Sequence, residues 1–218
     1  SDTINTFGLY ADGLILRVND HKTIISASKL SHLPVINALS NLSHPCQCLA
    51  GLMTLLEERG SLEKLNIVWM GPITNVANSW IDAFKKELGF SLNIFCPETW
   101  FEKYRKKMKE YDISIDLDGI VHHQINDQIL AQADAVMTDT WKSMGEDIKS
   151  QDYDLIKEFR VTEKIMQKTK SDSIFMHCLP ANRNEEVEAS VMDGSNSRVW
   201  QEASNRLFVQ KEILKVLF

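Results

Sequence analysis

Short apolar runs alternate with amphipathic stretches along most of the chain, and this alternation restricts the fold more than any other feature of the sequence. Asn66–Met70 and Ala135–Thr138 have the composition of buried strands, whereas Glu98–Glu110 has the charge and spacing of a surface helix. Parallel strands that are buried on both faces give near-continuous apolar runs, and the helices between them cover the sheet. The pattern therefore predicts an α/β fold with a parallel sheet flanked by helices.

The same interpretation assigns most of the remaining elements. Further strands are expected at Leu14–Leu16, Pro34–Asn37, Leu92–Phe95 and Ile174–Met176. Further helices are expected from an N-cap at Ser43 to Gly60, from Asn75 to Gly89, over Asp127–Ala133, after a cap at Thr162, and over Gln201–Leu217. In the helix that ends at Gly60, the periodicity predicts a buried stripe made of Leu49, Leu52, Met53 and Leu56.

Four polar clusters each follow an apolar run. They are Ser43–Gln47, Gly71–Ser79, Asp139–Gly145 and His177–Pro180. In open parallel sheets, ligands bind beyond the carboxyl ends of the strands. The four clusters are therefore expected to converge on one binding site.

Each cluster supports a chemical role and a purely structural one. The first can bind an anion or a polarised carbonyl at a helix N-terminus, with His44 as an added donor, or His44 and Gln47 can simply cap the helix. Asn75 can cap the next helix or hold a carboxylate. Asp139 can accept an ammonium group. Cys178 can be a nucleophile only if the fold supplies a histidine, and otherwise it is a buried, unreactive thiol.

Composition excludes several classes of protein. Of the 218 residues, 44% are hydrophobic and 25% are charged, which is usual for a globular chain, and the net charge of -6 comes without a basic cluster typical of nucleic-acid binding. No apolar run approaches the ~18 residues of a membrane span. The four cysteines form no CxxC pair and no zinc-finger spacing with histidine, so no metal site is expected. Four cysteines are too few for a disulfide framework in a chain of this length, so reduced thiols in a cytosol-like compartment are expected. No GxGxxG supports a dinucleotide site.

Taken together, the clusters resemble the motifs of the transcarbamylases, and among them most closely the ornithine carbamoyltransferases. The matching segments are His44-Pro45-Cys46-Gln47 (HPxQ), Asn75–Ser79 (the end of a GDGNNVANS-type turn), Asp139 with Ser143-Met144-Gly145 (DxxxSMG), His177–Pro180 (HCLP) and Asn205–Lys211 (NRLxxQK). The SMG and HCLP pair is the specific part, since aspartate transcarbamylases lack it. The resemblance covers nearly the whole chain.

The resemblance implies transfer of the carbamoyl group of carbamoyl phosphate to the δ-amine of ornithine, giving citrulline and phosphate without a metal or other cofactor. It implies that the catalytic residues are Arg17, His44, Cys178 and Arg206. Carbamoyl phosphate would contact Arg17, His44, Gln47 and Arg206, and ornithine would contact Asn75, Asp139, Ser143, Met144, Cys178 and Leu179. It also implies a cytoplasmic homotrimer, or a multiple of one.

The chain departs from the family pattern at three places. The family's GDGNN is replaced by Gly71–Asn75 with Pro72, and Asn182 and Asn184 stand where a His and a Gly follow HCLP. No Ser-x-Arg-Thr phosphate motif occurs in the chain. On this resemblance, roughly 80–100 residues of the family pattern lie before the first residue of the chain.

The expected organisation follows from these departures. Residues 1–60 are expected to be a remnant of a carbamoyl-phosphate domain, residues 61–200 the ornithine domain, and residues 201–218 a helix that returns to the first domain. The remnant should have an unpaired sheet edge and exposed apolar surface. Two alternatives remain open: a transcarbamylase for another amine, or a non-catalytic amino-acid-binding protein.

Overall fold

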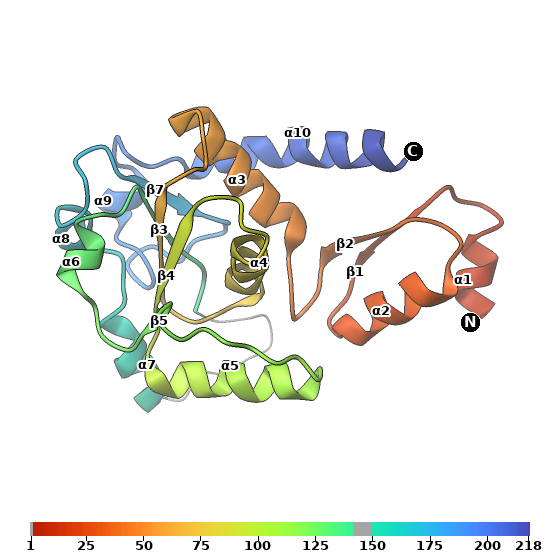
Figure 1. Ribbon diagram of the computed structural model, residues 1–218, viewed down its shortest axis with the longest axis horizontal. Helices are drawn as coiled ribbons and strands as arrows, with labels where there is room; N and C mark the ends of the chain where they lie inside the picture. The colour runs from red at the N-terminus through yellow and green to blue at the C-terminus, as the bar shows by residue number, and fades with distance from the viewer. Residues whose placement is uncertain (1, 142–149) are drawn as a thin grey trace.

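The centre of the molecule is a parallel β-sheet. The structure is a computed structural model that describes residues 2–141 and 150–218, and this part of the chain contains a five-stranded sheet in the order β5-β4-β3-β6-β7 (Figure 1). The strands are β3 (Asn66–Met70), β4 (Ser91–Phe95), β5 (Val121–His122), β6 (Ala135–Thr138) and β7 (Ile174–His177). All neighbouring strands in it run parallel, which confirms the fold class predicted from the alternation.

Helices cover both faces of this sheet. On one face lie α3 (Pro45–Arg59), α4 (Asn75–Phe84) and α5 (Glu98–Glu110), and on the other α6 (Asp127–Leu130), α8 (Glu163–Met166) and α9 (Ala189–Met192). Two further helices are α7 (Ser150–Lys157) and α10 (Val199–Leu217). Because both faces are covered, β6 and β7 are buried at every position, as their unbroken apolar runs predicted.

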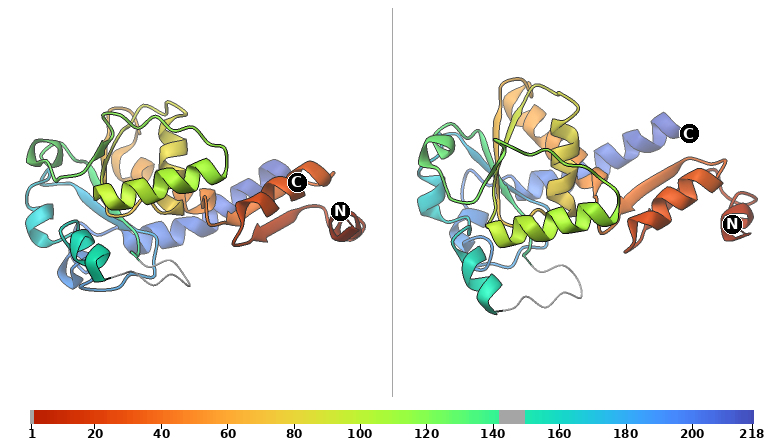
Figure 2. Two further views of the ribbon diagram at one scale, coloured as in Figure 1. Left: turned by 90° about the horizontal axis from the view of Figure 1, so that it is seen from below. Right: turned by 60° about the horizontal axis from the view of Figure 1, so that its bottom comes forward.

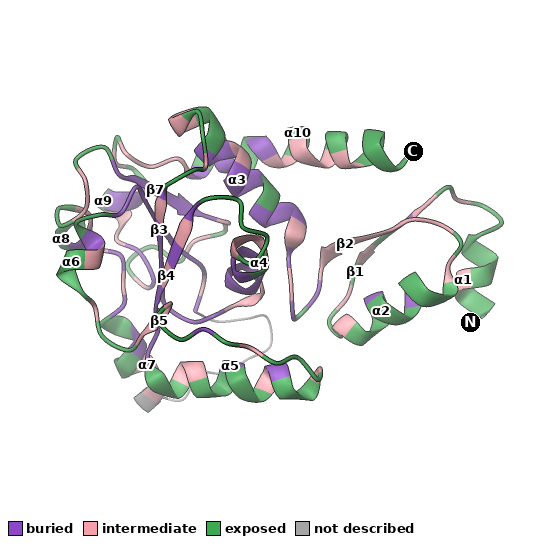
Figure 3. Cartoon of the chain, in the orientation of Figure 1, coloured by how far each residue is buried: buried purple, intermediate pink, exposed green. Residues whose placement is uncertain are grey.

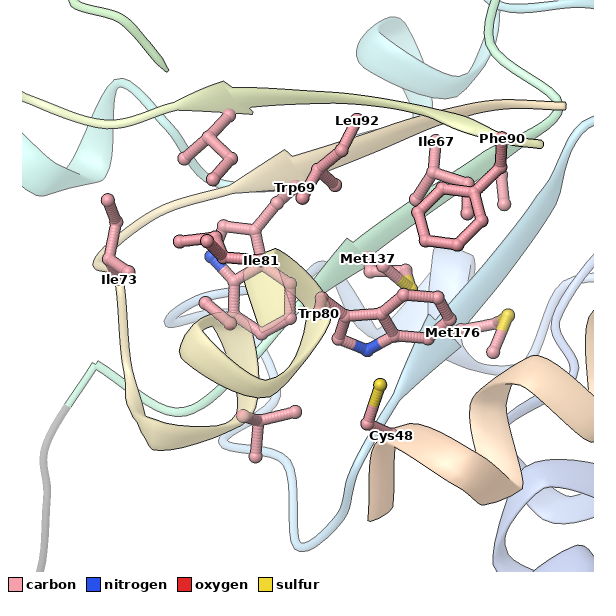
Figure 4. Packing of buried hydrophobic residues seen from close by; sticks show 14 of the residues in the cluster. Cys48, Ile67, Trp69, Ile73, Trp80, Ile81, Phe90, Leu92, Met137 and Met176 are labelled. Atoms are coloured by element: carbon pink, nitrogen blue, oxygen red, sulfur yellow. The ribbon is translucent and has the colours of Figure 1, made fainter. Parts of the chain in front are cut away.

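Successive residues of β3 enter two different hydrophobic clusters, as the two-residue period of a strand requires. Ile67 and Trp69 join the cluster under α3, α4 and α5, while Val68 and Met70 join the opposite one. In the first cluster Trp69 lies close to Trp80 of α4, and both indoles are almost completely buried (Figure 4). The Trp69 Nε1–H donates to the Pro72 carbonyl at 2.9 Å, so this core also fixes the turn after β3.

A smaller N-terminal unit, residues 2–39, stands beside the main sheet. It contains α1 (Asp2–Phe7), β1 (Leu14–Arg17), α2 (His21–Leu30) and β2 (Val35–Leu39). Its two strands pair only with each other among the described residues, in parallel, and much of its surface is exposed (Figure 3). Ile15 is 59% exposed. Within the described residues the region thus has the unpaired sheet edge and the exposed apolar surface that were expected.

The longest helix, α10, runs along α3 and continues toward the N-terminal unit (Figures 1 and 2). The Asn205 amide donates to Thr54 Oγ1 at 2.9 Å and to Glu57 Oε2 at 2.7 Å, which ties α10 to α3. At its far end the Phe218 ring packs against Gly13, where a side chain would leave no room for it. The last helix thus contacts both parts of the molecule.

Several details of the sequence interpretation are wrong. The N-cap of α3 is His44 rather than Ser43, and its side chain makes no capping bond. Of the predicted buried stripe of α3, Leu52 is buried, whereas Leu49 and Leu56 are 41% and 45% exposed. The buried face also contains small residues such as Ala50 and Gly51. Glu57 of this helix binds Gln201 and Asn205 of α10, a polar contact that a stripe of large apolar residues could not predict.

Helix ends were the other source of error. The helix α4 ends at Phe84 rather than Gly89, because the backbone turns through Glu87 at a positive φ of 54°. The helix α6 stops at Leu130, and α10 begins two residues before Gln201. Thr162 caps α8 as predicted, accepting from the Ile165 N–H at 3.2 Å.

No helix in the described part of the chain is long and apolar enough to cross a membrane.

Candidate active site

The carboxyl ends of β3, β6 and β7 lie side by side, and the described polar residues that follow β6 and β7 meet there. Asp139 follows β6, and Cys178 follows β7. The Cys178 Sγ donates to Asp139 Oδ1 at 2.9 Å, so the two residues form a pair although 39 positions separate them. Ser143 and Met144, which the resemblance assigns to ornithine, lie outside the described residues.

Burial controls the protonation of Cys178. Dense packing raises the pKa of its thiol well above 9, and the negative charge of Asp139 raises it further. The Asp139 carboxylate also accepts the Thr140 backbone N–H at 2.7 Å, which fixes its orientation. A thiol that stays protonated is a poor nucleophile. The geometry therefore favours a hydrogen-bonding role for Cys178 over a nucleophilic one.

The segment after Cys178 is held by a buried pair from the same loop. His177 Nδ1 accepts the Leu179 N–H at 3.0 Å, and His177 Nε2 lies 3.3 Å from Glu186 Oε1. Neither of these two side chains has any exposed surface. Leu179 has a positive φ of 48° and precedes a cis peptide bond to Pro180. The Leu179 backbone thus has a fixed direction at the edge of the site.

The departure at Asn184 has a simple structural explanation. Asn184 adopts a φ of 65°, in the left-handed region that Gly tolerates and that Asn enters more readily than other residues. Its side chain also accepts the Ala189 backbone N–H at 3.2 Å. Replacement of the family's Gly by Asn therefore preserves this turn. Nothing in the structure explains the change at Asn182, whose backbone N–H donates to Glu186 at 2.5 Å.

His44 begins α3 beside the carboxyl end of β2, and it is almost fully buried. Burial lowers its pKa to about 4, with smaller contributions from the positive charges of Arg206 and Arg17. The imidazole is therefore neutral near pH 7. Its Nδ1 is buried and has no hydrogen-bond partner within the described ranges. A neutral ring that also experiences two guanidinium charges is suited to hydrogen-bond an oxygen that gains negative charge.

Arg206, Leu207 and Cys178 line the same open cavity of about 700 Å³, between the loop after β7 and α10. Leu179 lines it as well. Arg17 is exposed at the end of β1, near enough for its charge to act on His44. The predicted catalytic residues thus gather from β1, α3, the loop after β7 and α10, with Arg206 next to both His44 and the cavity.

Hydrogen bonds connect the first residues of α4 to the segment that begins α3. Thr74 caps α4 by accepting the Ala77 N–H, so the suggestion that Asn75 is the cap is wrong. The Asn75 amide instead donates to the Ser40 carbonyl at 2.7 Å. Ser79 accepts the His44 backbone N–H at 2.8 Å, a contact that no pattern in the sequence indicates. These bonds place Asn75 at the boundary between the two parts of the molecule.

Gln47 lies in the first turn of α3, and its Nε2 donates to Glu202 Oε1 of α10 at 2.9 Å. The alternative that Gln47 only caps the helix is therefore wrong. Glu202 itself was not identified as a site residue. The one available signal is its spacing: it stands four residues before Arg206, on a helix face that also carries the buried Asn205.

Among the described residues, no group of three or more His, Cys, Asp or Glu side chains is arranged to hold a metal ion. The site is instead a set of hydrogen-bond donors, two arginines and a carboxylate–thiol pair. Such a set can orient two substrates and stabilise an oxyanion between them.

Comparison with known proteins places this chain in a family. Residues 63–217 match the family described as aspartate/ornithine carbamoyltransferase, Asp/Orn binding domain, and residues 1–57 match its carbamoyl-P binding domain. The chain therefore belongs to the aspartate/ornithine carbamoyltransferase family, which confirms the resemblance seen in the motifs.

Individual relatives agree. The chain is 38% identical over 220 residues to an ornithine carbamoyltransferase from Pyrococcus abyssi, covering 100% of this chain and 69% of that protein. The solved structure of an ornithine carbamoyltransferase from Pyrococcus furiosus is similar, with a TM-score of 0.84 at 37% identity, covering 98% of this chain and 68% of that one. An N-acetyl-L-ornithine transcarbamylase structure is also similar, with a TM-score of 0.78 at 28% identity, covering 100% of this chain and 73% of its own.

Proposed function

We propose that this protein transfers the carbamoyl group of carbamoyl phosphate to the δ-amine of ornithine, giving citrulline and phosphate. The observation that carries the proposal is the pairing of Cys178 with Asp139 at the cavity that Arg206 also lines. Relatives named ornithine carbamoyltransferase are 36–38% identical to the chain over nearly its full length, which supports the same assignment.

The carbamoyl phosphate side of the site is cationic. Arg17 and Arg206 attract the phosphate and carbamoyl oxygens, and neutral His44 donates a hydrogen bond to the carbamoyl oxygen. Gln47 contacts the carbamoyl nitrogen. Donors that already point at the oxygen stabilise the tetrahedral intermediate without rearrangement, and the loss of one such donor typically costs about 10²–10³ in rate.

The ornithine side uses the residues after β6 and β7. Asp139 attracts the α-ammonium group, while Asn75, Ser143 and Met144 hold the α-amino acid portion. Cys178 and the Leu179 carbonyl orient the δ-amine toward the carbonyl carbon. The amine nitrogen then forms the new C–N bond, the C–O bond to phosphate breaks, and the proton of the amine passes to the departing phosphate.

The domain organisation is part of the same proposal. Residues 1–60 would contribute the carbamoyl-phosphate side, residues 61–200 the ornithine side, and residues 201–218 a helix that joins them. The separate two-stranded and five-stranded sheets and the contact of Phe218 with Gly13 support this division. We propose further that the enzyme works in the cytoplasm as a homotrimer or a multiple of one, without a metal or other cofactor.

A colorimetric citrulline assay tests the activity. Protein purified from the coding sequence that contains this chain is incubated with carbamoyl phosphate and, in separate reactions, ornithine, N-acetylornithine, lysine or putrescine. Product is expected with ornithine and is expected to require both substrates. Absence of a carbamoylated product with every amine would refute the proposal, and Arg206→Ala serves as the inactive control.

A second candidate is transfer to a different amine. The observation in its favour is the turn between β3 and α4, where Pro72 and Thr74 replace family residues near the proposed ornithine side. The similar N-acetyl-L-ornithine transcarbamylase shows that this fold accommodates another acceptor. Preference for N-acetylornithine over ornithine in the same assay would favour this candidate.

A further inference from the structure

A buried carboxylate, that of Glu202, lies between α3 and α10 and contacts the Gln47 side chain. Glu202 is only 3% exposed, and its Oε1 accepts a hydrogen bond from Gln47 Nε2 at 2.9 Å. A side-chain carboxylate without access to water is costly unless its partners are specific. Glu202 lies next to Gln47, a proposed substrate-binding residue, which suggests that the buried carboxylate has a function.

The bond fixes the direction of the Gln47 amide. An ionised carboxylate can only accept hydrogen bonds, so it selects the NH₂ end of the amide and turns the carbonyl end away. Gln47 Oε1 is buried and has no hydrogen-bond partner in the part of the chain that the structure describes. An acceptor held in this way is suited to a ligand that donates through nitrogen.

We propose that Glu202 is a positioning residue that orients the Gln47 amide, so that Gln47 Oε1 accepts a hydrogen bond from the NH₂ group of the carbamoyl donor. This inference rests on the proposed function for the identity of that donor. It assigns Glu202 no contact with substrate. The role is to choose between the two orientations of an amide that packing alone would not distinguish.

The surroundings of Glu202 explain why a carboxylate can persist there. Burial raises its pKa to about 7, while the bond from Gln47 and the nearby His177 lower it. The other titratable groups that face it are Asp139 after β6, Cys178 after β7 and Cys48 on α3. The carboxylate is therefore ionised above about pH 7, where it selects the orientation described above.

The first test needs no catalysis. The substitution Glu202→Gln keeps the size of the side chain but offers both a donor and an acceptor, so the Gln47 orientation is no longer enforced. In the wild-type protein, the side-chain ¹⁵N–¹H resonances of Gln47 should titrate with the ionisation of Glu202, and in the variant they should shift and lose that titration. Gln47 resonances that are the same in both proteins at all pH values would overturn the proposal.

The second test is kinetic and uses Gln47→Ala as the partner in a double-mutant cycle. Glu202→Gln alone should raise the KM for carbamoyl phosphate about tenfold, as expected for the loss of one good hydrogen bond, with a much smaller change in kcat. In the Gln47→Ala background it should add nothing. Additive effects would show that Glu202 acts through the fold rather than through Gln47.

Glu57→Gln is the matched control, since Glu57 also bridges α3 and α10 through Gln201 and Asn205 but lies away from Gln47. It should leave the KM for carbamoyl phosphate unchanged, and an equal rise would overturn the positioning role. The two tests also separate the two proposals. A wild-type protein that makes no citrulline would refute the proposed function, while the resonances of Gln47 would still decide whether Glu202 orients it.

Discussion

At the scale of single residues, His44 and Cys178 both lie where burial sets their protonation. Burial lowers the pKa of His44 to about 4 and raises that of Cys178 well above 9, so that both are neutral near pH 7. Each then acts as a hydrogen-bonding group rather than as a base or a nucleophile. This agrees with a reaction that needs orientation and oxyanion stabilisation but no covalent intermediate.

Replacing Cys178 tests its orienting role. Cys178→Ala removes the bond to Asp139 Oδ1 and the contact proposed for the amine, so kcat for citrulline formation should fall about 10²-fold. Cys178→Ser keeps a donor at the same place and should retain more activity. Thermal melts should show that both variants fold, and an unchanged kcat in Cys178→Ala would contradict the role.

His44 should make the protein less stable in acid. Its folded pKa of about 4 lies below the ordinary value of 6.5, so the native state binds fewer protons than the unfolded state between these pH values. The contribution of His44 to the free energy of unfolding is therefore complete above about pH 6.5. It is lost as the pH falls from there through about 4, by roughly 3 kcal/mol in total. Urea unfolding of wild type and His44→Asn at several pH values measures the effect. Equal acid slopes for the two proteins would refute it.

At the scale of elements, the contact between α3 and α10 joins the two sides of the proposed site. Thr54, Glu57 and Asn205 form a polar network along the contact, and Gln47 and Glu202 extend it toward the cavity. Small residues of α3 allow this close approach. The apolar periodicity of α3 predicted large apolar side chains on its buried face, and it did not predict the polar contact with α10.

Gly51→Ala tests how closely α3 is packed. A Cβ at this position would lie 2.5 Å from Trp80 Cζ2 and 3.3 Å from Glu202 Oε1, and Trp80 is almost fully buried. The overpacking cost of about 1–3 kcal/mol should exceed the gain of about 1 kcal/mol in helix propensity. Urea unfolding should therefore show a less stable variant. A more stable one would contradict the tight packing, and Leu56→Ala, on the exposed side of α3, should cost under about 1 kcal/mol.

At the scale of the whole molecule, the N-terminal unit is held to the main body by a small set of contacts. The Tyr111 hydroxyl, just after α5, lies 3.1 Å from Asp20 Oδ1 and 3.0 Å from Asn41 Oδ1. The His21 and Tyr111 rings meet edge to face, with centroids 6.1 Å apart. Since a two-stranded sheet is marginally stable alone, these contacts should contribute to the order of the N-terminal unit.

Hydrogen exchange measured by mass spectrometry tests this difference between the two units. Amides of β1 and β2 should exchange faster than those of β3 and β6, which are buried and covered on both faces. Tyr111→Phe removes the hydroxyl and should further speed exchange in β1 and β2 while leaving the main sheet unchanged. Equal protection of the amides in both sheets would contradict the expected difference. Slower amide exchange in both sheets of the variant would contradict the stabilising role of the Tyr111 hydroxyl.

The parallel sheet was predictable because its signal is local. Strands such as Asn66–Met70 and Ala135–Thr138 appear in the structure with the predicted bounds, since a run buried on both faces is predominantly apolar. The helix Glu98–Glu110 was predictable for the complementary reason, a charged exposed face. The start of α3 was not, because Ser79, which is distant in the sequence, binds the His44 backbone N–H. The end of α4 was not either, because the apolar period continues to Leu88 although the backbone already turns at Glu87.

The sequence by itself determined the class of fold and the family, because the strand–helix alternation and the motifs both depend on residues that lie close together in the sequence. Only the tertiary structure decided the roles of Glu202, which lies outside every motif, and of Ser79, whose motif does not indicate its bond; the two act through Gln47 and His44. The same holds for the protonation of His44 and Cys178. Burial and nearby charges set those pKa values, and both depend on which elements the fold brings together.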